Sequence, residues 1–212
     1  MVDLTKKRNM SQLREKSPSS TAQAIVYDPS AAVGNRAGRV PLSQAIAQFQ
    51  YSSIAGIYDY NDAGTTSSPI SMPSSGTWYT LTNDGLGPLT VTDYGKAGIA
   101  NVWDSSTNSF DWSGLEIGSR VDIRVDVTVT TTSSNQVVYI HLFNDDGGAA
   151  EYEIPMDAGS FHKFSDSHRI VVSQFFYIGN DETKNGFSRL KIKSDGAASV
   201  VVTGWAVGVM GS

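Results

Sequence analysis

The sequence contains no cysteine and no uninterrupted apolar run of transmembrane length. Without cysteine the chain cannot form a disulfide framework, a thiolate metal site or a thiol nucleophile. The amino-terminal segment MVDLTKKRNMSQLREK is too charged to contain the apolar core of a signal peptide. The most apolar stretch, VVVTGWAVGVM, is short and interrupted by glycine, so it does not qualify as a membrane span. We therefore expect a protein that is made in a cytoplasm and does not enter a membrane.

Long segments with helical periodicity are also missing, which excludes folds built from alternating strands and helices. Short helical patterns occur only near the amino terminus, in MSQLREK with Ser11 as its cap and in PLSQAIAQFQ. From about Tyr51 onward, roughly eight to ten short strands alternate with turns. The sequence therefore predicts an all-β fold, an antiparallel β-sandwich of the jelly-roll type, preceded by an extended amino-terminal arm.

The clearest strand is SRVDIRVDVTVTTT, in which apolar and polar residues alternate over ten positions. Its apolar residues should face the core: Val121, Ile123, Val125, Val127 and Val129. A turn at 133–135 then predicts a hairpin with QVVYIHLF, and the turn NDDGG predicts a second hairpin with AAEYEIPM. Further strands are expected in GTWYTLTND, LTVTDY, HRIVVSQFFYIG, FSRLKIKS and ASVVVTGWAVGVM.

Charge is distributed unevenly between the arm and the remainder of the chain. Residues 1–48 hold seven basic and three acidic residues, a net charge of +4, which leaves −9 for the rest because the whole chain carries −5. The asymmetry indicates an arm, residues 1–50, that docks onto an acidic surface, and a body, residues 51–212. Nucleic acid is a poorer partner because the basic residues are dispersed and lack interleaved aromatic residues. The anchoring residues are Lys6, Lys7, Arg8, Arg14, Lys16, Arg36 and Arg39.

The closing strand VVVTGWAVGV lacks the polar alternation of a strand with one wet face. Sorted by alternate positions, it has a bulky face for the core, formed by Val201, Thr203, Trp205, Val207 and Val209. The other face is small and apolar, and glycines weaken a strand unless another backbone approaches closely. A neighbouring copy of the chain, or a loop or the arm of the same chain, would cover that face. The predicted interface residues are Val200, Val202, Gly204, Ala206 and Gly208.

Groups that carry out catalysis or bind metals are scarce. The three histidines, His141, His162 and His168, match no zinc spacing, and no GxSxG, GxGxxG or Walker A motif is present. The carboxylates Glu151 and Glu153 are better explained as a solvated strand face than as an acid–base pair. NDDGGAAEYE has the composition of a calcium loop without its spacing. We therefore expect no enzymatic activity, no catalytic residue, no bound metal and no cofactor.

Aromatic residues gather in the first half of the body, around NVWDSSTNSFDW. Exposed Trp and Tyr rings flanked by Asn, Asp and Ser are suited to stacking on sugar rings, whereas buried rings would fill the core of a sandwich. If exposed, the rings that would contact a glycan are Tyr94, Trp103 and Trp112.

The series GTWYTLTNDGLGPLTVTDYGKAGIANVWDSSTNSFDWSGLEIGSRVDIRVDVTVTTTSSNQ and the ending FSRLKIKSDGAASVVVTGWAVGVM resemble the jelly-roll modules of tailed-bacteriophage virion proteins, found in head fibres, capsid decoration proteins and tail fibres. The resemblance covers about residues 54–212. It implies a trimer of sandwiches similar to tumour necrosis factor, with the closing strand near the three-fold axis. It also implies location in a virion assembled in the host cytoplasm, with the arm bound to other virion proteins.

Two functions follow from these features. The first is a non-enzymatic structural protein of the virion, a trimeric capsid decoration or head fibre anchored by its arm. The alternative is a tail-fibre or receptor-binding module that recognises host surface polysaccharide. Nucleic acid and membrane are not expected partners in either case.

Overall fold

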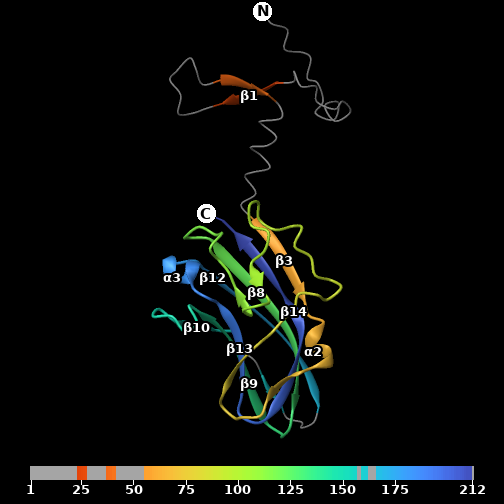
Figure 1. The fold of residues 1–212 in the computed structure, drawn as a ribbon. Helices are drawn as coiled ribbons and strands as arrows, with labels where there is room; N and C mark the ends of the chain where they lie inside the picture. Colours follow the sequence, from red (N-terminus) through yellow and green to blue (C-terminus); the bar gives the residue numbers. More distant parts are fainter. Residues whose placement is uncertain (1–22, 28–36, 42–54, 157–158, 162–165, 212) are drawn as a thin grey trace, which may run out of the picture. The chain divides into compact units, whose positions relative to one another are not determined.

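The computed structural model describes residues 23–27, 37–41, 55–156, 159–161 and 166–211, and the chain divides into two units, residues 1–53 and 54–212 (Figure 1). In the first unit, β1 (Gln23–Tyr27) pairs with β2 (Ala37–Pro41) as an antiparallel hairpin. The two short helices expected in the arm lie outside the described residues. The second unit holds all the other described elements.

The second unit is a sandwich of two antiparallel sheets. One, called here the β13 sheet, has the order β10 (Tyr152–Pro155), β9 (Gln136–Asn144), β13 (Arg189–Ser194), β5 (Trp78–Thr80), with β11 (Ser160–Phe161) also on β9. The other, the β14 sheet, has the order β12 (Ser167–Tyr177), β8 (Arg120–Thr131), β14 (Ala198–Met210), β3 (Ala55–Asn61), with β4 (Ile70–Met72) beside the first part of β14. The predicted antiparallel jelly-roll sandwich is confirmed.

Smaller elements complete this unit. The strands β6 (Trp103–Asp104) and β7 (Ser109–Phe110) pair with each other, and two short helices, α2 (Gly64–Ser67) and α3 (Asp181–Asn185), lie between strands. Asn180 caps α3 by accepting a hydrogen bond from the Thr183 backbone N–H. No helix in the described ranges has the length and apolar character needed to cross a bilayer.

The predicted alternation of β8 is confirmed, because Val121, Val125, Val127 and Val129 are fully buried and Ile123 is 2% exposed. Figure 1 shows β8 and β14 running side by side, as their register from Thr131↔Ala198 to Arg120↔Met210 requires. The other sheet contributes Ile140, Leu142, Leu190 and Ile192 to the same core. Alternating side chains of the two sheets therefore fill one hydrophobic interior.

The predicted hairpin between residues 119–132 and 136–143 is wrong, because β8 and β9 belong to different sheets. Both edges of β8 are already paired, with β12 and β14, so the chain must cross to the opposite sheet. Buried Gln136 fixes the crossing: its side-chain oxygen accepts from Thr132 N, and its Nε2 donates to Ser194 Oγ at 2.7 Å and to Ala197 O at 2.9 Å. The hairpin of β9 with β10 is confirmed.

The strand expected in LTVTDY is also wrong. Val91 makes a single bridge with Asp59, and the surrounding residues form turns closed by Thr90 N to Gly87 O and Gly95 N to Thr92 O. Two successive turns prevent a continuous ladder, so this segment lies along β3 as a loop.

Candidate functional site

The closing strand β14 contains a β-bulge that reverses its faces. Val202 pairs with Val127 and Gly204 with Asp126, so Thr203 is an additional residue on β14. The hydroxyl of Thr65, from α2, accepts the Val202 N–H at 2.8 Å and donates to Asp62 Oδ2 at 2.6 Å. The Asp62 N–H donates to Thr203 O at 3.1 Å. The bulge is thus held by residues far away in sequence.

The bulge divides the five residues predicted to form one small outer face. Val200 and Val202 are buried in the core, at 0% and 1% exposure, so their predicted place on the outer face is wrong. After the bulge the alternation follows the prediction: Trp205, Val207 and Val209 are buried, and Ala206 and Gly208 face outward, half-buried. Gly204 is buried beside β3 with a φ of +154°, and a Cβ at this position would lie 2.3 Å from Tyr60 O.

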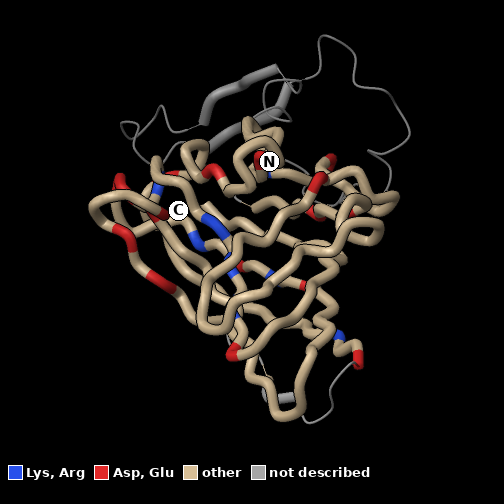
Figure 2. The backbone as a smooth tube through the Cα atoms, turned by 60° about the horizontal axis from the view of Figure 1, so that its bottom comes forward, with Lys and Arg blue, Asp and Glu red and all other residues tan. Residues whose placement is uncertain are grey.

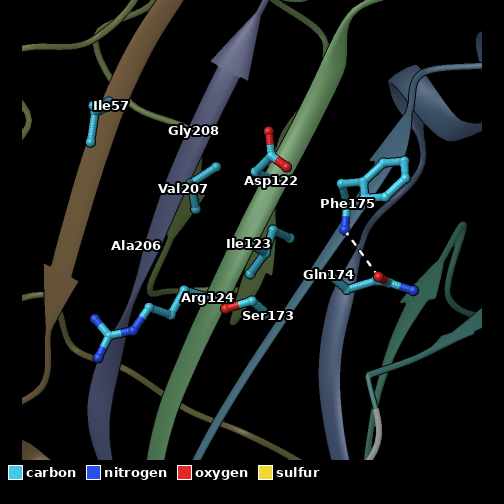
Figure 3. Close-up of a pocket in the computed structure, with 10 residues that line it drawn as sticks. All are labelled: Ile57, Asp122, Ile123, Arg124, Ser173, Gln174, Phe175, Ala206, Val207 and Gly208. Carbon is cyan, nitrogen blue, oxygen red and sulfur yellow. Dashed lines mark hydrogen bonds between the residues drawn. The ribbon is translucent and has the colours of Figure 1, made fainter.

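The outer face of the β14 sheet carries large apolar side chains at its two sides and smaller side chains in its centre. Ile57 on β3 and Phe175 on β12 are 62% and 59% exposed, and the row between them passes through Gly208 and Asp122. Figure 3 shows Ile57 and Phe175 on opposite sides of the hollow, with Gly208 and Asp122 between them. The hollow has a volume of about 350 Å³. Because its floor lacks large side chains, a ring or branched aliphatic group fits into it.

Exposed apolar side chains continue from this hollow along the same face. Met210 and Tyr177, in the next row of the sheet, are 48% and 67% exposed, and Val171 on β12 is 47% exposed. Large apolar side chains exposed on one face of a sheet indicate an interaction surface. We call this surface the β14 face; its apolar residues are Ile57, Val171, Phe175, Tyr177 and Met210.

Charged pairs occupy the middle of the β14 face. Arg120 Nη2 lies 2.7 Å from Asp122 Oδ1, and the Arg120 guanidinium stacks 4.6 Å from the Phe175 ring centroid. Asp126, whose side chain is 8% exposed, binds Arg169 through two hydrogen bonds and Arg124 through one. The hydrogen bonds to Asp126 raise the pKa of Arg169 above its ordinary value. Each of these arginines is paired with an aspartate of the same sheet, and because Asp126 is shared by two of them the cluster keeps one net positive charge.

The strand β12 forms an edge of the β14 sheet. Its 11 residues pair with β8 on one side, and no other described strand pairs with it. A groove of about 480 Å³ lies beside this edge, lined by Tyr152 and Ile154 from β10 and by Phe175 and Tyr177 from β12. Natural proteins normally protect such a long apolar edge by covering or charging it. The edge therefore extends the surface available to a partner.

Two of the three predicted glycan-contacting residues are buried, so that prediction is wrong for Trp103 and Trp112. Trp103 is 4% exposed, packs 4.4 Å from Trp205 between ring centroids and donates its indole N–H to Asn83 O. Trp112 is fully buried and donates its indole N–H to Ser188 Oγ at 2.9 Å. Both rings therefore fill the core. Tyr94 is 75% exposed on its loop.

Of the seven predicted anchoring residues, only Arg39 is described, and it lies in β2 opposite Ile25. The other six lie outside the described residues: Lys6, Lys7, Arg8, Arg14, Lys16 and Arg36. His141 Nδ1 lies 2.8 Å from Glu153 Oε2, and its ring packs on Trp78. His162 lies outside the described residues, and the described ones contain no group of three or more His, Asp or Glu placed to hold a metal ion.

The outer face of the β13 sheet has a different character, with basic and aromatic residues interleaved. Arg189 and Lys191 on β13 both bind Asp146, at 3.0 Å and 2.5 Å, and the Asp146 side chain is 9% exposed. Burial alone would raise the pKa of Asp146, but hydrogen bonds from Lys191 and Arg189, with the attraction of their charges, lower it overall. Asp146 thus holds two cations together on this face.

Replacing Asp146 with asparagine should destabilise the sandwich by roughly 1–3 kcal/mol at neutral pH, because two half-buried cations lose their shared carboxylate. The folded pKa of Asp146 is below its unfolded value, so this stabilisation exists above the unfolded pKa of about 4 and is lost as the pH falls through the folded pKa. Urea unfolding of both proteins should therefore show a difference that shrinks below about pH 4. Exposed Asp93→Asn is the control and should change stability by less than about 0.5 kcal/mol. An undiminished difference in acid would contradict this account.

Sequence reasoning missed the two surfaces that the structure assembles. The signal for the β14 face was present in SQFFYIG, where Phe175 and Tyr177 share one side of a strand and buried Phe176 the other. The signal for the β13 sheet was the alternation of Arg189, Lys191 and Lys193 with apolar residues in RLKIKS. Neither pattern showed which strands would lie beside it.

No protein-family model matches the sequence, and neither does any curated protein. Among solved structures, the chain is similar to the infectious bursal disease virus Gt strain structure, at 10% identity and a TM-score of 0.42, covering 92% of this chain and 42% of that one. It is also similar to the VP2 subviral particle of that virus, at 8% identity and a TM-score of 0.43, covering 87% and 37%. The chain thus spans about two fifths of these chains. At these scores the likeness assigns neither a family nor a function.

Proposed function

We propose that this chain is a non-enzymatic structural component of a virus particle, a trimeric capsid decoration or head fibre anchored through residues 1–50. The observation that carries the proposal is the β14 face, an apolar surface with a central hollow that continues onto an unpaired edge strand. Three copies related by cyclic symmetry would cover this surface in a closed assembly. The resemblance of the sequence to phage virion modules is the reason for proposing a virus particle as the assembly to which the chain belongs.

The second unit carries its own core, as a projecting module needs. Its described buried residues form one cluster contributed by both sheets. Residues 1–50 are then available for attachment to another virion protein. Their net positive charge suits an acidic docking surface, because opposite charges accelerate and orient association. Assembly would take place in the cytoplasm of the host.

A glycan-binding function through Trp103 and Trp112 loses its support, since both rings are in the core. The receptor-binding alternative therefore needs another surface. The outer face of the β13 sheet is on the opposite side of the sandwich from the β14 face and would stay accessible in such a trimer.

Deleting residues 2–40 should abolish incorporation of the protein into virus particles and leave the sandwich folded. The reason is that the deletion removes all seven basic residues of the arm and none of the core cluster. Incorporation is measured by immunoblot of purified particles from cells expressing wild-type or deleted protein. A variant in which the seven basic residues become glutamine separates the contribution of charge from that of chain length. Undiminished incorporation of the deletion variant would refute anchoring by the arm.

A further inference from the structure

The outer face of the β13 sheet carries a row of three cations. Arg189, Lys191 and Lys193 occupy alternate positions of β13, so their side chains leave the same face at intervals of about 6.7 Å. The residues between them, Leu190 and Ile192, point to the opposite face of the strand and are buried in the core. The sandwich thus fixes the direction of all three cations.

Aromatic rings flank this row on both sides. Lys193 Nζ lies 4.4 Å from the Trp78 ring centroid and 5.2 Å from that of Tyr139, and Lys191 Nζ lies 4.4 Å from that of Phe143. Trp78 comes from β5, whereas Tyr139 and Phe143 come from β9, and these are the two strands that pair with β13. Cation–π contacts hold the ammonium groups in place and reduce the conformational entropy lost on binding an anion.

The positive charge of the row is only partly neutralised. Asp146 is shared by Arg189 and Lys191, and Glu153 on β10 pairs with His141 rather than with the row. Lys193 has rings on both sides and no carboxylate partner among the described residues. Figure 2 shows that acidic residues of the body lie largely on its outer loops, with several basic residues on strands nearer the centre of the view. The row therefore forms a cationic strip that keeps uncompensated positive charge at Lys193.

We propose that this strip, Arg189, Lys191 and Lys193 with the 40%-exposed ring of Tyr139, binds an anionic polysaccharide through its carboxylate groups. Carboxylates form charge-assisted hydrogen bonds with ammonium and guanidinium groups, and sugar rings pack against the edge of an exposed tyrosine. The strip lies on the opposite sheet from the β14 face, so the inference does not depend on the oligomeric state.

One feature favours a polysaccharide over single-stranded nucleic acid. The ring faces that bases would stack on are occupied by Lys191 and Lys193, whereas single-strand binding uses free aromatic faces.

The test measures binding of the full-length protein to fluorescently labelled polygalacturonate, with neutral dextran and oligo(dT) as comparisons. We expect binding to polygalacturonate that weakens as salt rises from about 50 to 200 mM, and no binding to dextran. Lys193→Gln should reduce the affinity for polygalacturonate about three- to tenfold, because one charge-assisted contact is lost. Lys184→Gln, an equal charge change on α3, should leave that affinity within about twofold. Thermal unfolding of both variants should match wild type.

Three results would overturn the inference. The first is absence of polygalacturonate binding by the wild-type protein at low salt. The second is an equal loss of affinity in Lys193→Gln and Lys184→Gln, which would indicate only a response to net charge. The third is tighter binding to oligo(dT) than to polygalacturonate with the same dependence on Lys193, which would assign the strip to nucleic acid.

Discussion

Replacing Gly204 with alanine should lower the free energy of unfolding by at least about 3 kcal/mol, the largest stability effect that we expect from a single added methyl group. A Cβ at this position would lie 2.3 Å from the carbonyl oxygen of Tyr60 and 3.0 Å from the Cα of Asn61. Both atoms are backbone, so no side-chain rotation relieves the overlap. The φ of +154° is also one that residues with a Cβ rarely adopt.

Gly208, four residues later on the same strand, is the matched control. The nearest atom to its Cβ would be Asp122 Cβ at 3.8 Å, an ordinary van der Waals distance. Gly208→Ala should therefore change the unfolding free energy by less than about 1 kcal/mol. Differential scanning calorimetry compares the two variants, and a decrease of roughly 6–12 °C in Tm is expected for Gly204→Ala alone. A Tm within about 2 °C of wild type for Gly204→Ala would show that the bulge rearranges at little cost.

Replacing Phe175 with aspartate should convert the proposed trimer into monomers. Light scattering of the wild-type protein should give about three times the chain mass of 22.7 kDa at micromolar concentration. The Phe175 ring, 59% exposed, borders both the hollow of the β14 face and the groove beside β12. The substitution removes this apolar ring from the proposed interface and leaves a carboxylate beside Arg120 and Asp122 that would be desolvated on assembly, so we expect association to weaken at least about a hundredfold.

The control is Phe187→Asp, which introduces the same charge at a ring that is 53% exposed and lies two residues before β13. Its mass should remain that of the wild-type protein. Circular dichroism of both variants checks that the sandwich stays folded. A wild-type monomer or dimer would contradict the trimer, and a trimeric Phe175→Asp variant would remove the β14 face from the interface.

Local sequence pattern was sufficient wherever a strand stays regular. In β8, Val121 to Val129 alternate with polar residues and face the core as predicted. This success has a simple reason: side chains of a strand alternate by geometry, and burial of one face fixes the phase. The same reasoning located β13 and the hairpin of β9 with β10.

The pattern failed where a distant residue changes the phase or the pairing. The faces of β14 reverse at Thr203 because Thr65 and Asp62, far away in the chain, hold the bulge. The sequence alone left both a surface role and a core role open for Trp103 and Trp112. The packing of Trp205, Phe110 and Phe176 around them makes them core residues. Similarly, β8 cannot pair with β9 because β12 and β14 already occupy its edges.

The sequence by itself therefore determined the all-β sandwich, the inward residues of its regular strands and the division of charge between arm and body. Composition and period-two alternation are local properties, and burial acts on them directly. Only the tertiary structure decided which residues form surfaces. It placed Phe175 beside the hollow over Gly208, and Lys193 between Trp78 and Tyr139, by pairing strands that are remote in sequence. Strand order depends on non-local pairing energies that no short segment encodes.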